Sequence, residues 1–153
     1  MAFFVESSAR FSSATVPRRV RWTLSAAGLS LWGLLAVAAM LQPDPSGLGT
    51  HRQLGLPPCT FSLLFGVRCP TCGMTTAWSN VMHGRATAAL QANVCGVLLA
   101  LATFGGGGWC LATAARGRWS FGAPSETSVA CLALVVLALI LLEWSLRLYL
   151  FRD

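Results

Sequence analysis

The residues most able to do chemistry are two cysteines in the stretch CPTCG, residues 69–73. Two thiolates at this spacing can bind one tetrahedral metal ion, and the glycine that follows lets the backbone turn back around the sulfurs. A third cysteine, Cys59, precedes the pair by ten residues, and His83 follows it by eleven. Because a closed zinc site takes four ligands, Cys59, Cys69, Cys72 and His83 form a candidate Cys₃His site.

The same cysteines support two other interpretations. A Cys-x-x-Cys pair at the start of a short helix can exchange disulfides, because the helix dipole lowers the pKa of a thiol there. The sequence lacks the soluble βαβ framework that usually surrounds such a redox pair. In an oxidising compartment the loop would instead hold a structural disulfide, joining Cys59 to Cys69 or Cys72, or the last two to each other. We favour the disulfide narrowly over the metal, because the arginine distribution places this loop outside the cytoplasm.

Other reactive groups are poor candidates for catalysis. Cys95, Cys110 and Cys131 fall within apolar runs, where cysteine behaves as a small apolar residue. His51 falls in a linker rich in proline and glycine, and none of the five acidic residues clusters near either histidine. The sequence therefore lacks the residues needed for acid–base hydrolysis, for a carboxylate metal site or for a nucleotide-binding loop. This favours a non-catalytic protein.

The elements that must position the cysteines follow from the composition. The 153 residues are 55% hydrophobic and only 10% charged, whereas a soluble domain carries about a quarter charged residues. Three apolar runs are long enough to cross a bilayer. We predict an all-α integral membrane protein of three transmembrane helices, with a cysteine-containing loop and a short interfacial helix between helices 1 and 2. The predicted segments are an N-terminal tail 1–21, helix 1 at 22–41, the cysteine loop 42–85, helix 2 at 86–115, a connecting loop 116–126, and helix 3 at 127–151.

Within the loop, helical spacing after Gly73 predicts a short amphipathic helix at the membrane interface. Its apolar face would comprise Met74, Trp78, Val81 and Met82. We expect apolar loop side chains to be buried around the cysteines and to make the loop rigid. These are Phe61, Phe65, Trp78 and Met82.

Helix 2 carries a stripe of small residues at every fourth position, namely Ala88, Ala92, Gly96 and Ala100. Such a stripe lets a second helix approach closely in lipid, and we expect the partner to be a helix of the same chain. The run FGGGGW at 104–109 predicts a tightly packed helix in preference to a kink or a break.

The net charge of +6 comes from arginines alone, and they lie at the ends of the apolar runs. Nucleic-acid binding needs a basic soluble face interleaved with aromatic residues, so we exclude it. The expected partners are the lipid bilayer and a larger membrane protein complex. Six arginines fall on the side of the N-terminal tail and five on the other side, a bias that predicts a cytoplasmic N-terminus.

The stretch from Pro58 to Asn93 contains Pro-Cys-x-Phe, a glycine, Cys-Pro-x-Cys-Gly-x-Thr and an alanine-rich segment ending in asparagine. This pattern resembles the small bacterial membrane proteins grouped as domain of unknown function 2752. The resemblance implies a multi-pass protein of the bacterial inner membrane in which Cys59 belongs with the Cys-x-x-Cys pair, and it implies no established activity. Thr76 and Val94 depart from the arginine and proline that relatives often carry. The matching positions are Pro58, Cys59, Phe61, Gly66, Cys69, Pro70, Cys72, Gly73, Thr75, Ala77, Gly84, Ala89 and Asn93.

We therefore expect a small integral membrane protein that acts as a non-catalytic accessory or scaffold subunit. Its loop would be locked at Cys59, Cys69 and Cys72 by a disulfide or a metal and would form a docking surface. The alternatives are a membrane thiol–disulfide oxidoreductase and a metal-binding or electron-transfer membrane protein. Zinc is the candidate ion, and no other cofactor is indicated.

Overall fold

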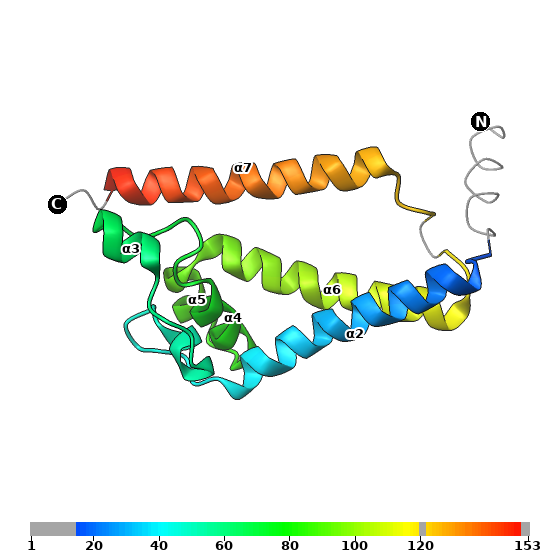
Figure 1. Cartoon of the computed structure of the whole chain (residues 1–153), viewed down its shortest axis with the longest axis horizontal. Helices are drawn as coiled ribbons and strands as arrows, with labels where there is room; N and C mark the ends of the chain where they lie inside the picture. The colour runs from blue at the N-terminus through cyan, green and yellow to red at the C-terminus, as the bar shows by residue number, and fades with distance from the viewer. Residues whose placement is uncertain (1–14, 120–121, 151–153) are drawn as a thin grey trace.

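Three long helices dominate the computed structural model, which describes residues 15–119 and 122–150 (Figure 1). They are α2 (Arg18–Met40), α6 (Val94–Arg116) and α7 (Glu126–Leu150). Each is long and apolar enough to cross a membrane. The described residues form no strand, and the predicted all-α class with three transmembrane helices is confirmed. Most of the predicted tail, including Arg10, lies outside the described residues, as do Phe151 and Arg152.

α2 and α6 run antiparallel and make the main helix–helix interface (Figure 1). Glycines allow the close approach: a Cβ added at Gly28 would lie 2.7 Å from Leu111 Cγ, and one added at Gly107 would lie 2.9 Å from Trp32 Cδ1. The ring centroids of Trp32 and Phe104 are 4.7 Å apart beside this contact. α6 continues unbroken through the glycine run, so the tightly packed helix predicted there is what forms.

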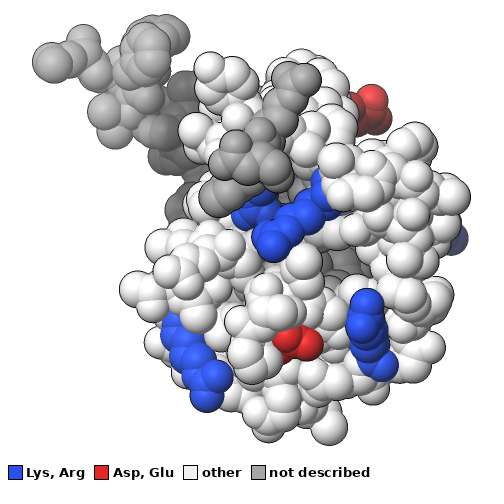
Figure 2. Space-filling model, turned by 90° about the vertical axis from the view of Figure 1, so that its left-hand side faces the viewer, with Lys and Arg blue, Asp and Glu red and all other residues white. Residues whose placement is uncertain are grey.

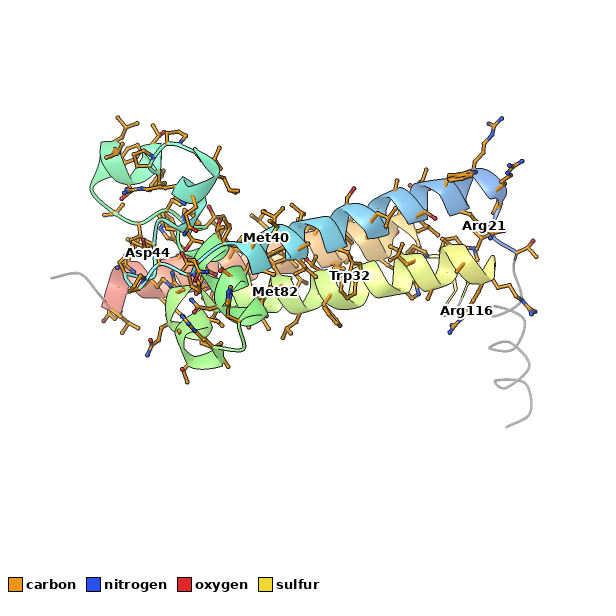
Figure 3. All side chains as sticks on the ribbon, turned by 90° about the horizontal axis from the view of Figure 1, so that it is seen from below. Arg21, Trp32, Met40, Asp44, Met82 and Arg116 are labelled. Carbon is orange, nitrogen blue, oxygen red and sulfur yellow. The ribbon has the colours of Figure 1, made fainter. Side chains whose placement is uncertain are left out.

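α2 and α6 form a helical hairpin, and an arginine joins the start of α2 to the end of α6. Arg21 Nε donates to the carbonyl of Ala114 at 2.8 Å, at the point where α6 ends and its last carbonyls lack helical partners. Gly117 follows with a φ of 64°, the left-handed conformation common after a helix C-terminus. Figure 3 shows Arg21 and Arg116 together at this end of the hairpin, with Trp32 between the two helices.

The short helices lie at the opposite end, near Met40 and Met82 (Figure 3). The helix α4 packs against α2, α5 and α6, and its buried residues are small or polar. Ser79 Oγ donates to the carbonyl of Leu41 at 2.6 Å, and the hydroxyls of Thr50 and Thr76 are 2.8 Å apart. The apolar face predicted for this helix is only half-buried, because hydrogen-bonded polar side chains occupy the packed side. The short helices are η1 (Thr50–Leu54), α3 (Thr60–Phe65), α4 (Met74–Met82) and α5 (Ala86–Ala92).

The single helix predicted over 86–115 is in fact two helices, α5 and α6, which meet at Asn93. Asn93 has extended backbone angles, and its Oδ1 accepts the N–H of Gly96 at 2.6 Å. Asparagine is among the best N-cap residues, which explains why a new helix starts here. Its Nδ2 donates to the carbonyl of Cys72 at 3.2 Å, so the break also supports the cysteine turn.

The small-residue stripe is therefore divided between two helices. Ala92, Gly96 and Ala100 are buried, whereas Ala88 lies on α5 and is half-buried. A Cβ added at Gly96 would lie 3.0 Å from the Cβ of Ala77, so the close neighbour at this position is α4 of the same chain.

α7 lies to one side of the hairpin and has no buried residue (Figure 1). Polar contacts hold its C-terminal part: the Glu143 carboxylate accepts the N–H groups of Val94 at 2.9 Å and Cys95 at 2.8 Å. Arg147 pairs with Glu143 and donates to the carbonyl of Ala92 at 3.2 Å. The pair thus satisfies the last carbonyl of α5 and the first amides of α6, at the break between them.

Candidate thiol site

The three loop cysteines come from two turns that flank α3. Cys59 is the residue before α3, and Cys69 and Cys72 lie in the turn that leads into α4. Gly73 closes this turn with a φ of 85°, and a Cβ there would lie 2.5 Å from the carbonyl oxygen of Ala92. Only glycine can hold this backbone conformation so close to α5.

The sulfurs of Cys59, Cys69 and Cys72 all lie within 4.8 Å of one another, as expected from the sequence. The Cys69 and Cys72 sulfurs are 2.9 Å apart. A disulfide would bring two sulfurs to about 2.05 Å, and a tetrahedral ion with metal–sulfur bonds of about 2.3 Å would hold them about 3.8 Å apart. A shift of under about 1 Å reaches either arrangement, so the cluster can become a disulfide or a metal site without rebuilding the loop.

The two thiols of the pair differ in their pKa values. Burial raises the pKa of Cys69, but hydrogen bonds with Cys72 and Thr71 outweigh burial, so the pKa is lowered. Burial and the hydrogen bond with Cys69 raise the pKa of Cys72 to about 12. The Cys72 sulfur also accepts the backbone N–H of Cys69 at 3.3 Å. Cys69 is therefore the thiol that ionises first and the stronger nucleophile at neutral pH.

The cysteines line an open cavity of about 550 Å³ between η1, α3 and the start of α4. Asp44, His51 and Arg52 from the linker form its polar wall. Ser46 donates to the Asp44 carboxylate from both its side chain and its backbone, which lowers the pKa of Asp44. Cys69 and Cys72 are both half-buried in the wall of this open cavity.

His83, the expected fourth ligand, is not part of the cluster. It follows α4 as its C-cap, its Nδ1 lies 2.8 Å from the carbonyl of Ser79, and it does not line the cavity. The cavity wall instead contains His51, whose Nε2 lies 3.2 Å from the carbonyl of Pro57.

The sequence predicts a linker around His51, and the structure differs. Thr50–Leu54 forms a 3₁₀ helix between Gly49 and Gly55, both with positive φ. The signal that could have found it is the spacing of these two glycines around a short polar stretch, since such glycines often end short helices.

Residues 59–105 match a family model described as protein of unknown function (DUF2752). The match confirms the resemblance predicted from the cysteine motif. It begins at Cys59 and ends inside α6, so it covers the thiol turns, α3, α4, α5 and the helix break. No curated protein and no solved structure matches the chain. The chain is a small membrane protein, and the comparisons assign no activity to it.

Proposed function

We propose that this protein is a non-catalytic accessory or scaffold subunit of a larger membrane complex. Its docking surface is the segment between α2 and α5, locked in shape at Cys59, Cys69 and Cys72. The observation that carries the proposal is the convergence of the three sulfurs within 4.8 Å from both sides of α3. A bond or an ion at that point closes the exposed part of the loop into one rigid unit.

The convergence of three sulfurs favours a bound zinc ion as the lock, in place of the disulfide expected from the position of the loop outside the cytoplasm. A disulfide uses two sulfurs and leaves the third without a role, whereas a zinc site uses every thiolate in the cluster. The fourth position would be taken by a water in the cavity, because a tetrahedral site needs four donors and the described cluster supplies three sulfurs. Binding would deprotonate the thiols and couple the ion to the folding of the loop.

Other contacts support a rigid surface. The Asn93 side chain holds the carbonyl of Cys72, and Trp144 Nε1 donates to the carbonyl of Arg68 at 2.7 Å. These bonds tie the cysteine turn to the helix break and to α7. Figure 2 looks at this end of the molecule and shows arginine side chains separated by uncharged ones. A mostly uncharged, ordered face of this kind suits a protein partner.

The family resemblance supports the inner membrane of a bacterium, and the arginines support a cytoplasmic N-terminus in that membrane. The described arginines at the hairpin end with Arg21 include Arg18, Arg19, Arg116 and Arg118, whereas those near the thiol site are fewer and spread over separate turns. An excess of arginine marks the cytoplasmic side of a membrane protein. In this orientation the docking surface faces away from the cytoplasm.

The first experiment measures metal and thiol state on one preparation, purified in mild detergent without reductant or chelator. We expect about one zinc per chain, lost in Cys59→Ser and retained in the matched control Cys131→Ser. Mass spectrometry after alkylation should show the three thiols protected until a chelator is added. A zinc-free protein with a disulfide among the three cysteines would show that the loop is locked by a covalent bond and not by a metal.

Docking is tested by what remains bound to the purified protein. A defined partner should remain with the Cys131→Ser protein in native mass spectrometry and be lost from Cys59→Ser. A partner retained in both variants, or a protein that is monodisperse and alone in both, would contradict a docking role for the locked loop.

A second function is favoured by the position of the thiol pair on an open cavity. In this alternative the protein is a thiol–disulfide oxidoreductase. The Cys69 thiolate attacks the disulfide of an oxidised partner, and one partner sulfur leaves as a thiolate. Cys72 then attacks Cys69, which forms the internal disulfide and releases the reduced partner. Cys72→Ala should trap the mixed disulfide, and its failure to trap any partner would remove this alternative.

A further inference from the structure

α3 exposes more apolar surface than its setting in an aqueous loop can explain. The exposed fractions are 70% for Leu63, 73% for Leu64 and 65% for Phe65, and α3 has no buried residue. Burial of Phe65 around the cysteines was expected, and that expectation is wrong. Large apolar side chains gathered in this way mark a surface that meets another apolar phase.

The two faces of α3 have different surroundings. Cys59, Ser62 and Leu63 line the thiol cavity, whereas Leu64 and Phe65 do not. Phe61, Leu64 and Phe65 are three and four residues apart, so they lie on one side of the helix. The rings of Phe61 and Phe65 pack together with centroids 4.7 Å apart.

The face with Phe61 and Phe65 adjoins a helix that spans the membrane. The ring of Phe61 lies edge-on to Trp144 of α7, with centroids 6.2 Å apart, and Trp144 Nε1 donates to the carbonyl of Arg68 just after α3. Figure 1 shows α3 beside the C-terminal turns of α7. Since α7 has no buried residue in the described chain, its apolar side chains face lipid, and that lipid-facing surface continues onto α3.

We propose that α3 lies in the boundary between headgroups and acyl chains of the same bilayer, with Leu64 and Phe65 inserted. Trp144 and Tyr149, near the end of α7, mark this level, because tryptophan and tyrosine prefer the membrane interface. Arg68 follows the apolar face and can reach the phosphate groups. α3 is thus a monotopic anchor between Cys59 and Cys69, and it holds the mouth of the thiol cavity at the membrane surface.

This inference depends on the membrane setting alone and not on the docking role or on the state of the sulfurs. It predicts that Leu64 and Phe65 contact acyl chains while the polar wall of the cavity stays in water. A protein partner on the same face is the competing outcome.

The test uses the full-length protein in lipid nanodiscs with the photo-crosslinker benzoylphenylalanine at position 65. One control is position 137 in α7, where Leu137 is 52% exposed on a spanning helix. The other is position 54, where Leu54 is 49% exposed in the same loop and ends η1, the helix that supplies His51 and Arg52 to the cavity wall. Intact mass spectrometry then counts phospholipid adducts at each position.

We expect the adduct yield at 65 to be within about twofold of that at 137 and about tenfold above that at 54. A yield at 65 as low as that at 54 would overturn the anchor. The same measurement repeated in native membranes separates the alternative, because crosslinking of position 65 to a protein in place of lipid would also overturn it. A protein crosslink at 54 together with lipid at 65 would support both the docking surface and the anchor.

Discussion

α2 and α7 are both apolar enough to span a membrane, but they attach to α6 in different ways. α2 packs along α6 through glycines that let large side chains and backbone come close. α7 has no buried residue and is held by the Glu143–Arg147 pair and Trp144 near one end. Lipid is as apolar as leucine, so helices associate in it by close packing or by hydrogen bonds rather than by hydrophobicity. This chain uses close packing for one helix and polar contacts for the other.

We expect the largest loss of stability from a substitution in the interface between α2 and α6. Gly107→Leu places a side chain where Trp32 Cδ1 already lies, 2.9 Å from the position of the new Cβ. We expect a loss of about 3 kcal/mol in unfolding free energy, because a close-packed interface does not absorb added volume. Thermal unfolding in detergent measures it. The matched control is Gly106→Leu, since a Cβ at Gly106 meets nothing within 4 Å. Equal effects of the two substitutions would contradict the proposed interface.

We expect the second largest loss from a substitution that removes the polar contacts holding α7 to α6. Glu143→Gln removes the charge that accepts two backbone N–H groups and pairs with Arg147. Hydrogen bonds to charged groups contribute about 2 kcal/mol, so we expect a loss of that order and looser α7 contacts. Hydrogen exchange should increase at the amides of Val94 and Cys95 and remain unchanged in α2. Glu126→Gln, at the other end of α7, is the control and should change neither.

A smaller effect should follow from Trp144→Phe. The phenylalanine keeps the aromatic contact with Phe61 and removes only the Nε1 donor to the carbonyl of Arg68. We expect a loss of about 1 kcal/mol, the contribution of one hydrogen bond. Protease sensitivity between Cys59 and Cys72 should rise, because this bond holds the loop to α7. An unchanged digestion pattern would show that the loop is held by its own contacts.

The cysteines of the loop and the cysteine of α7 should differ in their rates of alkylation. In reduced, metal-free protein in nanodiscs, a water-soluble maleimide should modify Cys69 before Cys72. Its rate should rise as pH passes the lowered pKa of Cys69, well below the value of about 12 for Cys72. Cys131 of α7 is exposed in the structure but faces lipid in a bilayer, so it should react only after detergent is added. Rapid labelling of Cys131 in nanodiscs would contradict the placement of α7 in lipid.

The membrane class and the three spanning helices could be read from residue types alone. A long uncharged run such as that around Leu35 enters lipid, where its backbone N–H and C=O groups can be hydrogen-bonded only within a helix. Composition alone therefore predicts these three helices. The convergence of the three loop cysteines was also predictable, since short turns on either side of α3 leave them little room to separate.

The break at Asn93 could not be read from periodicity, because the alanine-rich segment before it and the apolar run after it read as one continuous helix. The break forms because the asparagine side chain caps α6 and because Glu143 and Arg147, fifty residues later, satisfy the freed backbone groups.

The sequence by itself determined which segments enter lipid and which residues could bind metal or exchange disulfides, because hydrophobicity and thiol chemistry belong to single residues and their near neighbours. Only the tertiary structure decided that His51 lines the thiol cavity while His83 does not, and that α3 leaves Leu64 and Phe65 exposed beside α7. These outcomes depend on which backbone and side-chain groups far apart in the chain meet, and local spacing carries no record of that.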